Sequence, residues 1–352
     1  MTKRSRYLLP KFLVVACLGV SLCGLGACAK TPDKLGDSLG GQPESPALDE
    51  NQLGVMLTKI DETLSAADTA LDDAQMVKRV VGPALKVRTV SYALGRMTQG
   101  AAKPPHLPIS DWQVLAMSTN PTWPRNVIVV SQPSAQPDAA PDAAKTVYMF
   151  GYEQGSVEAP YALWGWVRLF PGIQVPQTFK PDHGSTQPGM ENKDLAMEPS
   201  MVAVNYAKLL NNISDESVNT LFNTDVHLER YNNEKIQYAQ DLRNDGTVTF
   251  DAQPGKDGFL TLGTTDGGAI VMTTLDYSVT YQRTRAGATM AVGGALAPFL
   301  GGDVQVRGTV TSNGLLLAAF YIPPKDADNP RVTALGAERS VISAARDDSV
   351  SP

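Results

Sequence analysis

Apolar residues recur at helical spacing in the first third of the chain. Between residues 53 and 71 they stand three or four positions apart, which places them on one side of a helix and the intervening charged residues elsewhere. Gly82-Pro83 interrupts this pattern, and Pro83 suits the first turn of a second helix ending near Gly95. We therefore predict two amphipathic helices before any strand.

Segments typical of strands follow, and the second half of the chain repeats this order. Short apolar and aromatic runs predict three strands at 127–130, 146–150 and 161–170. A stripe formed by Met201, Val204, Ala207 and Leu210 then predicts another helix, and Ser214 is placed to cap a short helix through Phe222. Five further strands are predicted at 247–250, 258–263, 269–283, 304–311 and 315–322, the last two joined by a tight turn at Ser312-Asn313-Gly314.

Two successive halves of helices followed by strands predict an α+β fold with two tandem domains. Each would be a curved antiparallel sheet around helices, similar in outline to nuclear-transport-factor-2-like or cystatin-like cones. The divisions follow changes in composition, above all a stretch with five prolines between 171 and 199. We expect a signal peptide at 1–27, a flexible tether at 28–51, a first domain at 52–172, a Pro-rich linker at 173–199, a second domain at 200–345 and a disordered tail at 346–352.

The cysteines change the interpretation of the N-terminus. All three lie within the first 28 residues, which excludes a disulfide scaffold or a cysteine-ligated metal site from the rest of the chain. A basic leader precedes an apolar run, 12–27, that is short for a membrane-spanning helix and typical of a secretory signal. Leu25-Gly26-Ala27-Cys28 resembles a bacterial lipoprotein box, which implies cleavage between Ala27 and Cys28 and lipidation of Cys28. The alternatives are an uncleaved anchor, or an ordinary secretory signal in which Cys28 is incidental.

The net charge of the chain limits the classes of molecule that it is expected to bind. Loss of residues 1–27 removes four basic residues, leaving 26 Lys and Arg (30 − 4) against 36 Asp and Glu, a net charge of −10. A chain this acidic is a poor partner for nucleic acid or for an anionic membrane surface. Attachment to the bilayer would therefore depend on the acyl chains of Cys28, and the predicted location is the extracytoplasmic face of the cell membrane.

Two features allow both a structural and a functional interpretation. Trp164 and Trp166 share one strand face, and such aromatic residues either pack in the core or, with Tyr161, line a pocket in which Arg168 contacts an anion. The uncharged segment 286–302 either covers the end of the sheet or forms an apolar lip that touches lipid or a partner. The lip would consist of Met290, Val292, Leu296, Phe299 and Leu300.

Four segments carry a family resemblance. They are Arg79–Leu85, Ala159–Gly172, Ala319–Pro324 and Leu335–Glu338, and in this order they resemble uncharacterised cell-envelope lipoproteins of actinobacteria that share one domain of unknown function. The resemblance implies a surface lipoprotein of a Gram-positive envelope and supplies no catalytic residues.

Known catalytic patterns are missing from the sequence. It contains no nucleophile elbow, no phosphate-binding loop and no clustered histidines, so we predict no cofactor and no metal. A non-enzymatic protein that binds an envelope protein or a small apolar ligand is favoured. The alternatives are an envelope hydrolase using dispersed carboxylates such as Glu153 and Glu158, which must converge in one cleft, and a purely structural spacer.

Overall fold

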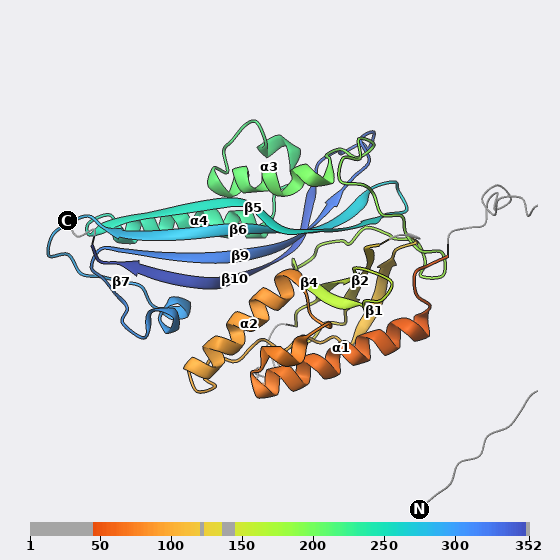
Figure 1. The fold of residues 1–352 in the computed structure, drawn as a ribbon. Helices are drawn as coiled ribbons and strands as arrows, with labels where there is room; N and C mark the ends of the chain where they lie inside the picture. The colour runs from red at the N-terminus through yellow and green to blue at the C-terminus, as the bar shows by residue number, and fades with distance from the viewer. Residues whose placement is uncertain (1–44, 120–122, 136–144, 350–352) are drawn as a thin grey trace, which may run out of the picture. The chain divides into compact units, whose positions relative to one another are not determined.

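A computed structural model describes residues 45–119, 123–135 and 145–349, and these described residues belong to one compact unit (Figure 1). This unit combines helices with an antiparallel sheet, which confirms the predicted α+β class. The predicted signal peptide, Ala27, Cys28 and most of the predicted tether lie outside the described residues. Within the described part of the chain, no helix is both long enough and apolar enough to cross a membrane.

The first two helices form as the apolar pattern predicts. Helix α1 (Glu50–Ala70) begins at a capping box, in which the Asp49 side chain accepts from Gln52 N at 2.7 Å and the Gln52 side chain accepts from Asp49 N at 2.9 Å. Helix α2 (Gly82–Met97) has Pro83 in its first turn, and the 3-10 helix η1 (Asp73–Met76) precedes it. Both predicted helices are therefore confirmed, and one face of each is buried.

Four strands follow as an antiparallel meander. They are β1 (Trp112–Met117), β2 (Arg125–Ser131), β3 (Tyr148–Gln154) and β4 (Ala162–Leu169), each paired with the next. The sequence predicted the last three and missed β1.

The helices of the second half differ from the prediction. Helix α3 (Pro199–Asn211) is present and buries Ala207 and Leu210 as predicted. It also buries Val202, Ala203 and Tyr206, whereas Met201 is 37% exposed. The short helix expected from Ser214 is replaced by the 3-10 helix η2 (Asn219–Leu221). Helix α4 (Val226–Leu242) was not predicted, because only two of its residues are buried and no apolar stripe marks it.

Long strands make up the rest of the chain: β5 (Gly246–Gly263), β6 (Ala269–Arg283), β9 (Thr309–Ile322) and β10 (Thr333–Asp347). Between β6 and β9 lie two short strands, β7 (Met290–Ala291) and β8 (Gln305–Val306), and two 3-10 helices, η3 (Gly294–Leu296) and η4 (Pro298–Leu300).

The tight turn predicted at Ser312–Gly314 is wrong, since β9 pairs with β6 without interruption from Thr309 to Ile322. Gly314 instead makes room for an aromatic ring. A Cβ atom there would lie 2.1 Å from Tyr277 Cζ.

One sheet joins the two predicted halves. Its strand order is β1-β2-β3-β4-β10-β9-β6-β5, and β4 meets β10 only through the pairs Leu169–Gly336 and Arg168–Ala337. The Pro-rich segment is also held, since Ser185 N donates to Met117 O at 2.6 Å and Ala196 N donates to Pro323 O at 2.9 Å. The two-domain division, with its linker at 173–199 and its separate cones, is therefore not confirmed.

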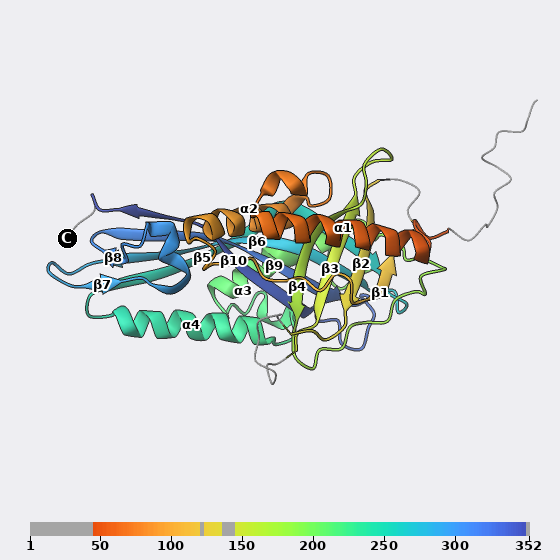
Figure 2. The same cartoon turned by 90° about the horizontal axis from the view of Figure 1, so that it is seen from below.

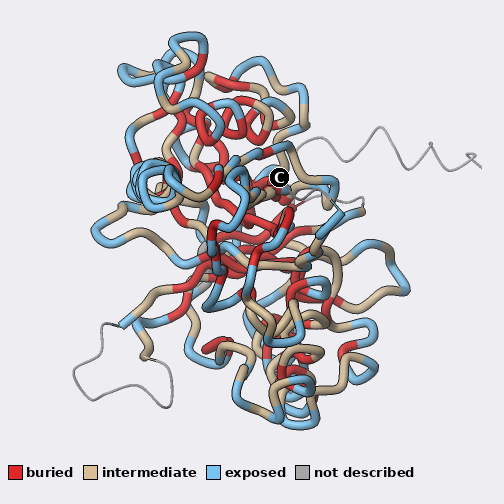
Figure 3. Tube along the Cα trace, turned by 90° about the vertical axis from the view of Figure 1, so that its left-hand side faces the viewer, coloured by how far each residue is buried: buried red, intermediate tan, exposed pale blue. Residues whose placement is uncertain are grey.

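Two hydrophobic cores lie on opposite faces of the long strands. Leu315, Leu317 and Ala319 of β9 belong to a core shared with α1, α2 and β1–β4, and the alternating residues Leu316 and Phe320 belong to a core shared with α3 and α4. Figure 2 shows α1 and α2 on one side of these strands and α4 on the other. Buried residues are concentrated along the strands between them (Figure 3).

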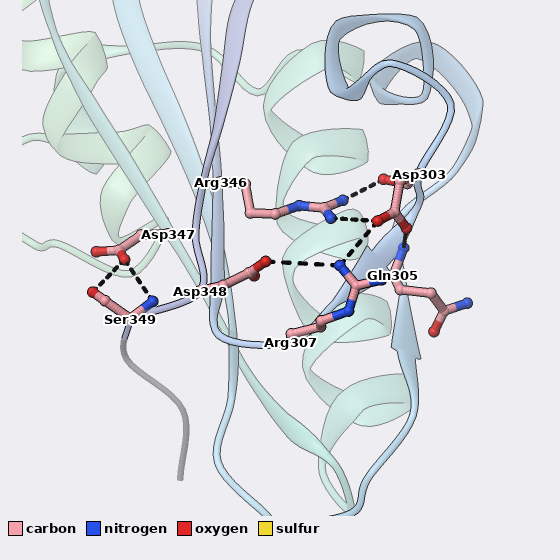
Figure 4. Close-up of polar contacts among 7 residues, drawn as sticks. All are labelled: Asp303, Gln305, Arg307, Arg346, Asp347, Asp348 and Ser349. Atoms are coloured by element: carbon pink, nitrogen blue, oxygen red, sulfur yellow. Dashed lines mark hydrogen bonds and ion pairs between the residues drawn. The ribbon is translucent and has the colours of Figure 1, made fainter.

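The C-terminal strand is anchored by charge beyond the predicted domain end. Arg346 and Arg307 donate to Asp303 Oδ2 at 2.7 and 2.9 Å, and Arg307 also lies 3.7 Å from Asp348 (Figure 4). Hydrogen bonds from the Arg346 side chain, from Gln305 N and from the Arg307 side chain, in that order, lower the pKa of Asp303 to about 2. Because β10 runs to Asp347, the tail predicted from 346 is corrected: its first two residues belong to a strand.

Candidate functional site

The predicted aromatic pocket is part of the core. Tyr161, Trp164 and Trp166 are 5%, 3% and 1% exposed and pack in the core beneath α1 and α2. The Arg88 guanidinium lies 5.3 Å from the Trp166 ring centroid, which gives that ring a cation–π partner inside the protein. The structural interpretation therefore holds for the three aromatic residues, and the pocket interpretation is corrected for them. Arg168 follows Trp166 by two residues, on the same face of β4, and lines a cleft.

The predicted apolar lip is also largely internal. Met290, Val292 and Leu296 are at most 8% exposed and form a small core with Val306 and Val310. Phe299 and Leu300 keep partial exposure. Segment 286–302 therefore covers the sheet, because its apolar side chains have partners within the chain, and the lip is corrected for its three buried members.

The cleft that contains Arg168 lies where β4 ends beside β10 and α4 passes over both strands. It has a volume of about 380 Å³. Its charged lining comes from these three elements, and Thr146, ahead of β3, and apolar side chains complete its wall. We call it the arginine cleft, and its lining includes Arg168, His227, Arg230, Tyr231, Glu234, Glu338 and Arg339.

Helix α4 supplies four of these side chains because they lie on one face of the helix. Asp225 caps the helix, its carboxylate accepting from Leu228 N at 2.8 Å. Residues 227, 230, 231 and 234 then follow at spacings of three, one and three, which places them on one helix face. The sequence-based prediction missed this set together with the helix. An N-cap aspartate followed by that spacing was the signal that could have found both.

Two of the three arginines in the cleft form ion pairs with its two glutamates. Arg168 holds the buried Glu338 with a two-pronged contact, Nε at 2.7 Å and Nη2 at 2.9 Å. Arg339 binds Glu234 at 2.7 Å. Arg230 is exposed and has no carboxylate partner among the residues that the structure describes. With three arginines against two glutamates, the cleft carries excess positive charge on an otherwise acidic protein.

A buried polar network supports the floor of the cleft. Tyr206 Oη donates to both carboxylate oxygens of Asp225 at 3.1 Å and lies 3.4 Å from His227 Nδ1. Since the single hydroxyl proton of Tyr206 is used by Asp225, we assign the ring proton of His227 to Nδ1. Nε2 is then a bare acceptor, and it has no hydrogen-bond partner within the described part of the chain.

The positive charge of the cleft acts on His227. Burial, followed by the charges of Arg339 and Arg230, lowers the pKa of His227 to about 4. The neighbouring Tyr231 is only 2% exposed, burial raises the pKa of its hydroxyl, and that hydroxyl also lacks a partner among the described residues. The cleft therefore combines a free cation, a bare acceptor and a buried hydroxyl, a set suited to a polar anionic ligand.

The two glutamates considered for hydrolysis lie together. Glu153, at the end of β3, and Glu158, in the following loop, line one shallow cavity of about 430 Å³. Burial raises the pKa of Glu153, and Ser156 Oγ donates to Glu158 at 3.1 Å. No group of three or more His, Cys, Asp or Glu side chains suited to a metal ion occurs among the residues with described positions.

Comparison with known proteins gives one match. The family described as "Domain of unknown function (DUF8094)" aligns with residues 44–346, which confirms the domain of unknown function expected from the sequence. No curated protein and no solved structure matches the chain.

Proposed function

Since the chain belongs to the DUF8094 family, whose description names no activity, we propose a function from the geometry of its site. The protein is a non-catalytic, extracytoplasmic lipoprotein of a bacterial cell envelope, anchored in the bilayer through acylated Cys28, that binds an anionic ligand or partner group in the arginine cleft. Its sequence resemblance to actinobacterial lipoproteins supports the envelope location.

One observation carries the binding proposal: Arg230 lines the cleft, and no carboxylate of the described residues pairs with it. Arg168 and Arg339 are already paired, so an incoming carboxylate or phosphate would find in Arg230 a cation that it need not compete for. The neutral His227 and the hydroxyl of Tyr231 would add hydrogen bonds beside that charge.

The anchor is tested by Cys28→Ser. We expect the substitution to abolish labelling with a fatty-acid analogue, and either to release mature-length protein or to leave the uncleaved precursor. Cys23→Ser is the matched control, because the small residues of the lipoprotein box precede Cys28 and not Cys23. Undiminished acylation of the Cys28→Ser protein would refute the assignment.

The binding site is tested through His227. The chain has three histidines, so selective labelling yields a simple NMR spectrum in which the pKa of each ring is measured with and without inorganic phosphate at matched ionic strength. A bound anion offsets the charges of Arg230 and Arg339, so phosphate should raise the pKa of His227 from about 4.

The variant and its control decide where the anion binds. Arg230→Gln should raise the pKa of His227 by itself and remove most of the phosphate effect. Arg243→Gln, an exposed arginine at the end of the same helix, should leave both unchanged. If phosphate does not move His227 in the unaltered protein, the arginine cleft is not an anion site.

A second candidate is an envelope hydrolase acting on wall or lipid precursors. It is favoured by the shared cavity of Glu153 and Glu158 and by the raised pKa of Glu153, a property of general acids. Incubation of the protein with isolated wall glycan tests it. Product that disappears in Glu153→Gln, and not in Glu191→Gln in the Pro-rich segment, would establish this activity. A purely structural spacer predicts neither product nor an effect of phosphate.

A further inference from the structure

A second cavity adjoins the arginine cleft. It has a volume of about 500 Å³, and Glu234 and Arg339 line both spaces. The walls come from α4, the long strands, α2 and the connection between β6 and β9. The Arg339 guanidinium lies 5.7 Å from the ring centroids of both Tyr231, in the arginine cleft, and Tyr277, in the second cavity. The Glu234–Arg339 ion pair therefore lies between the two adjoining cavities.

Aromatic rings and hydroxyl groups line the second cavity together with aliphatic side chains, among them Leu94, Val279, Leu296 and Val341. Tyr238 lies with its ring centroid 6.0 Å from that of Phe250 and 6.3 Å from that of Tyr281, and it is 37% exposed. The hydroxyls of Tyr238 and Tyr281 have no hydrogen-bond partner in the described part of the chain. The other rings are Tyr277 and Phe299, and three serines, Ser91, Ser312 and Ser340, complete the polar lining.

We propose that the arginine cleft and this second cavity form one extended site for an acidic saccharide. The acid group binds Arg230 in the cleft, and a following sugar ring lies against Tyr238 and Phe250. This inference rests on the proposed binding function and names the ligand class for the same site.

The lining favours a saccharide over a hydrocarbon chain. An acyl chain would cover serine and tyrosine hydroxyls without replacing their hydrogen bonds to water, which costs free energy. A sugar ring has an apolar C–H face for the aromatic rings and hydroxyls for the polar groups. In the arginine cleft, the bare acceptor His227 Nε2 requires a donor, and an anion without a hydroxyl group does not provide one.

The test compares four probes on the purified full-length protein by calorimetry: galacturonate, trigalacturonate, the neutral trisaccharide maltotriose, and palmitate. We expect trigalacturonate to bind about tenfold tighter than galacturonate, the gain typical of one well-placed aromatic contact. Maltotriose and palmitate should bind more weakly than trigalacturonate.

Two variants separate the parts of the site. Tyr238→Ala should abolish the tenfold gain of the trisaccharide and leave galacturonate binding unchanged. Ile236→Ala, which removes another exposed apolar side chain of α4 outside both cavities, should change neither. Arg230→Gln should weaken galacturonate and trigalacturonate alike. Circular dichroism and the thermal midpoint of each variant exclude loss of folding as the cause.

The outcomes distinguish this inference from the function on which it rests. If phosphate shifts the pKa of His227 but trigalacturonate binds no tighter than galacturonate, the saccharide inference fails and the anion site stands. Tighter binding of palmitate, equal binding of maltotriose, or an unaffected Tyr238→Ala protein would also overturn it. If neither phosphate nor galacturonate binds, both proposals fail together.

Discussion

His227 makes the stability of this protein sensitive to mild acid. Its pKa is about 4 in the folded protein, against an ordinary value of 6.5 in an unfolded chain. The folded state therefore takes up a proton less readily than the unfolded state, so the stabilisation is complete above pH 6.5 and is lost as the pH falls toward 4. The difference of about 2.5 units, at about 1.4 kcal/mol per unit, corresponds to about 3 kcal/mol of unfolding free energy.

The assay is urea unfolding between pH 4 and 8, followed by the fluorescence of the buried tryptophans. Burial raises the pKa of Asp225 and of Glu338, which gives a contribution of opposite sign at the acid end of this range. The informative quantity is therefore the difference between the unaltered protein and His227→Gln. Relative to the variant, the unaltered protein should lose about 3 kcal/mol between pH 7 and pH 4.

The control is His183→Gln, since His183 is exposed in the Pro-rich segment and its ring contacts the adjacent exposed Asp182 at 2.8 Å. The loss assigned to His227 is the part that exceeds any change seen with this control. A flat difference curve for His227→Gln would refute the reasoning, because it would mean that this ring takes up a proton in the folded protein as easily as in the unfolded chain.

Three further predictions concern the sheet, the first helix and the C-terminal cluster. Gly336→Ala places a Cβ 2.4 Å from the carbonyl oxygen of Arg168, at the narrow junction between β4 and β10, and should cost about 1–3 kcal/mol in urea unfolding; an unchanged midpoint would contradict the close contact. Gly54→Ala has open space within α1 and should stabilise the protein by about 1 kcal/mol in urea unfolding; an unchanged or lowered midpoint would contradict this. Arg346→Gln should raise the pKa of Asp303 from about 2, measured by carboxyl NMR; an unmoved pKa would assign the effect to the other donors.

The sequence predicted those elements that have a clear local pattern, either apolar residues at helical spacing or a continuous run of strand-forming residues. Helix α1 buries residues three and four positions apart, and β6 is a long β-branched and aromatic run, so both were found with nearly correct ends. Helix α4 has two buried residues, and the outer half of β10 from Arg339 onward has none that is fully buried, so neither shows a hydrophobic period. Ser312-Asn313-Gly314 has the composition of a turn, yet pairing on both edges of β9 holds it extended.

The candidate site was predicted only in part for the same reason. Arg168 was singled out as an anion contact because it follows two tryptophans on one strand face, and it does line the cleft. Arg230 and His227 were missed because they lie on α4, and Arg339 because it lies on β10. The two tryptophans are of a residue type that often lines pockets, but α2 covers them. The spacing of residues along a strand does not predict that contact.

The sequence by itself determined the α+β class, most of the elements, the acidic charge and the resemblance to a lipoprotein box, because each of these depends on residues that are close together along the chain. Only the tertiary structure decided that the two halves share one sheet, since the two pairs that join β4 to β10 connect residues more than 160 positions apart. The tertiary structure also decided the composition of the arginine cleft. Arg168, Arg230 and Arg339 come from three elements, and no short-range pattern records that these elements meet.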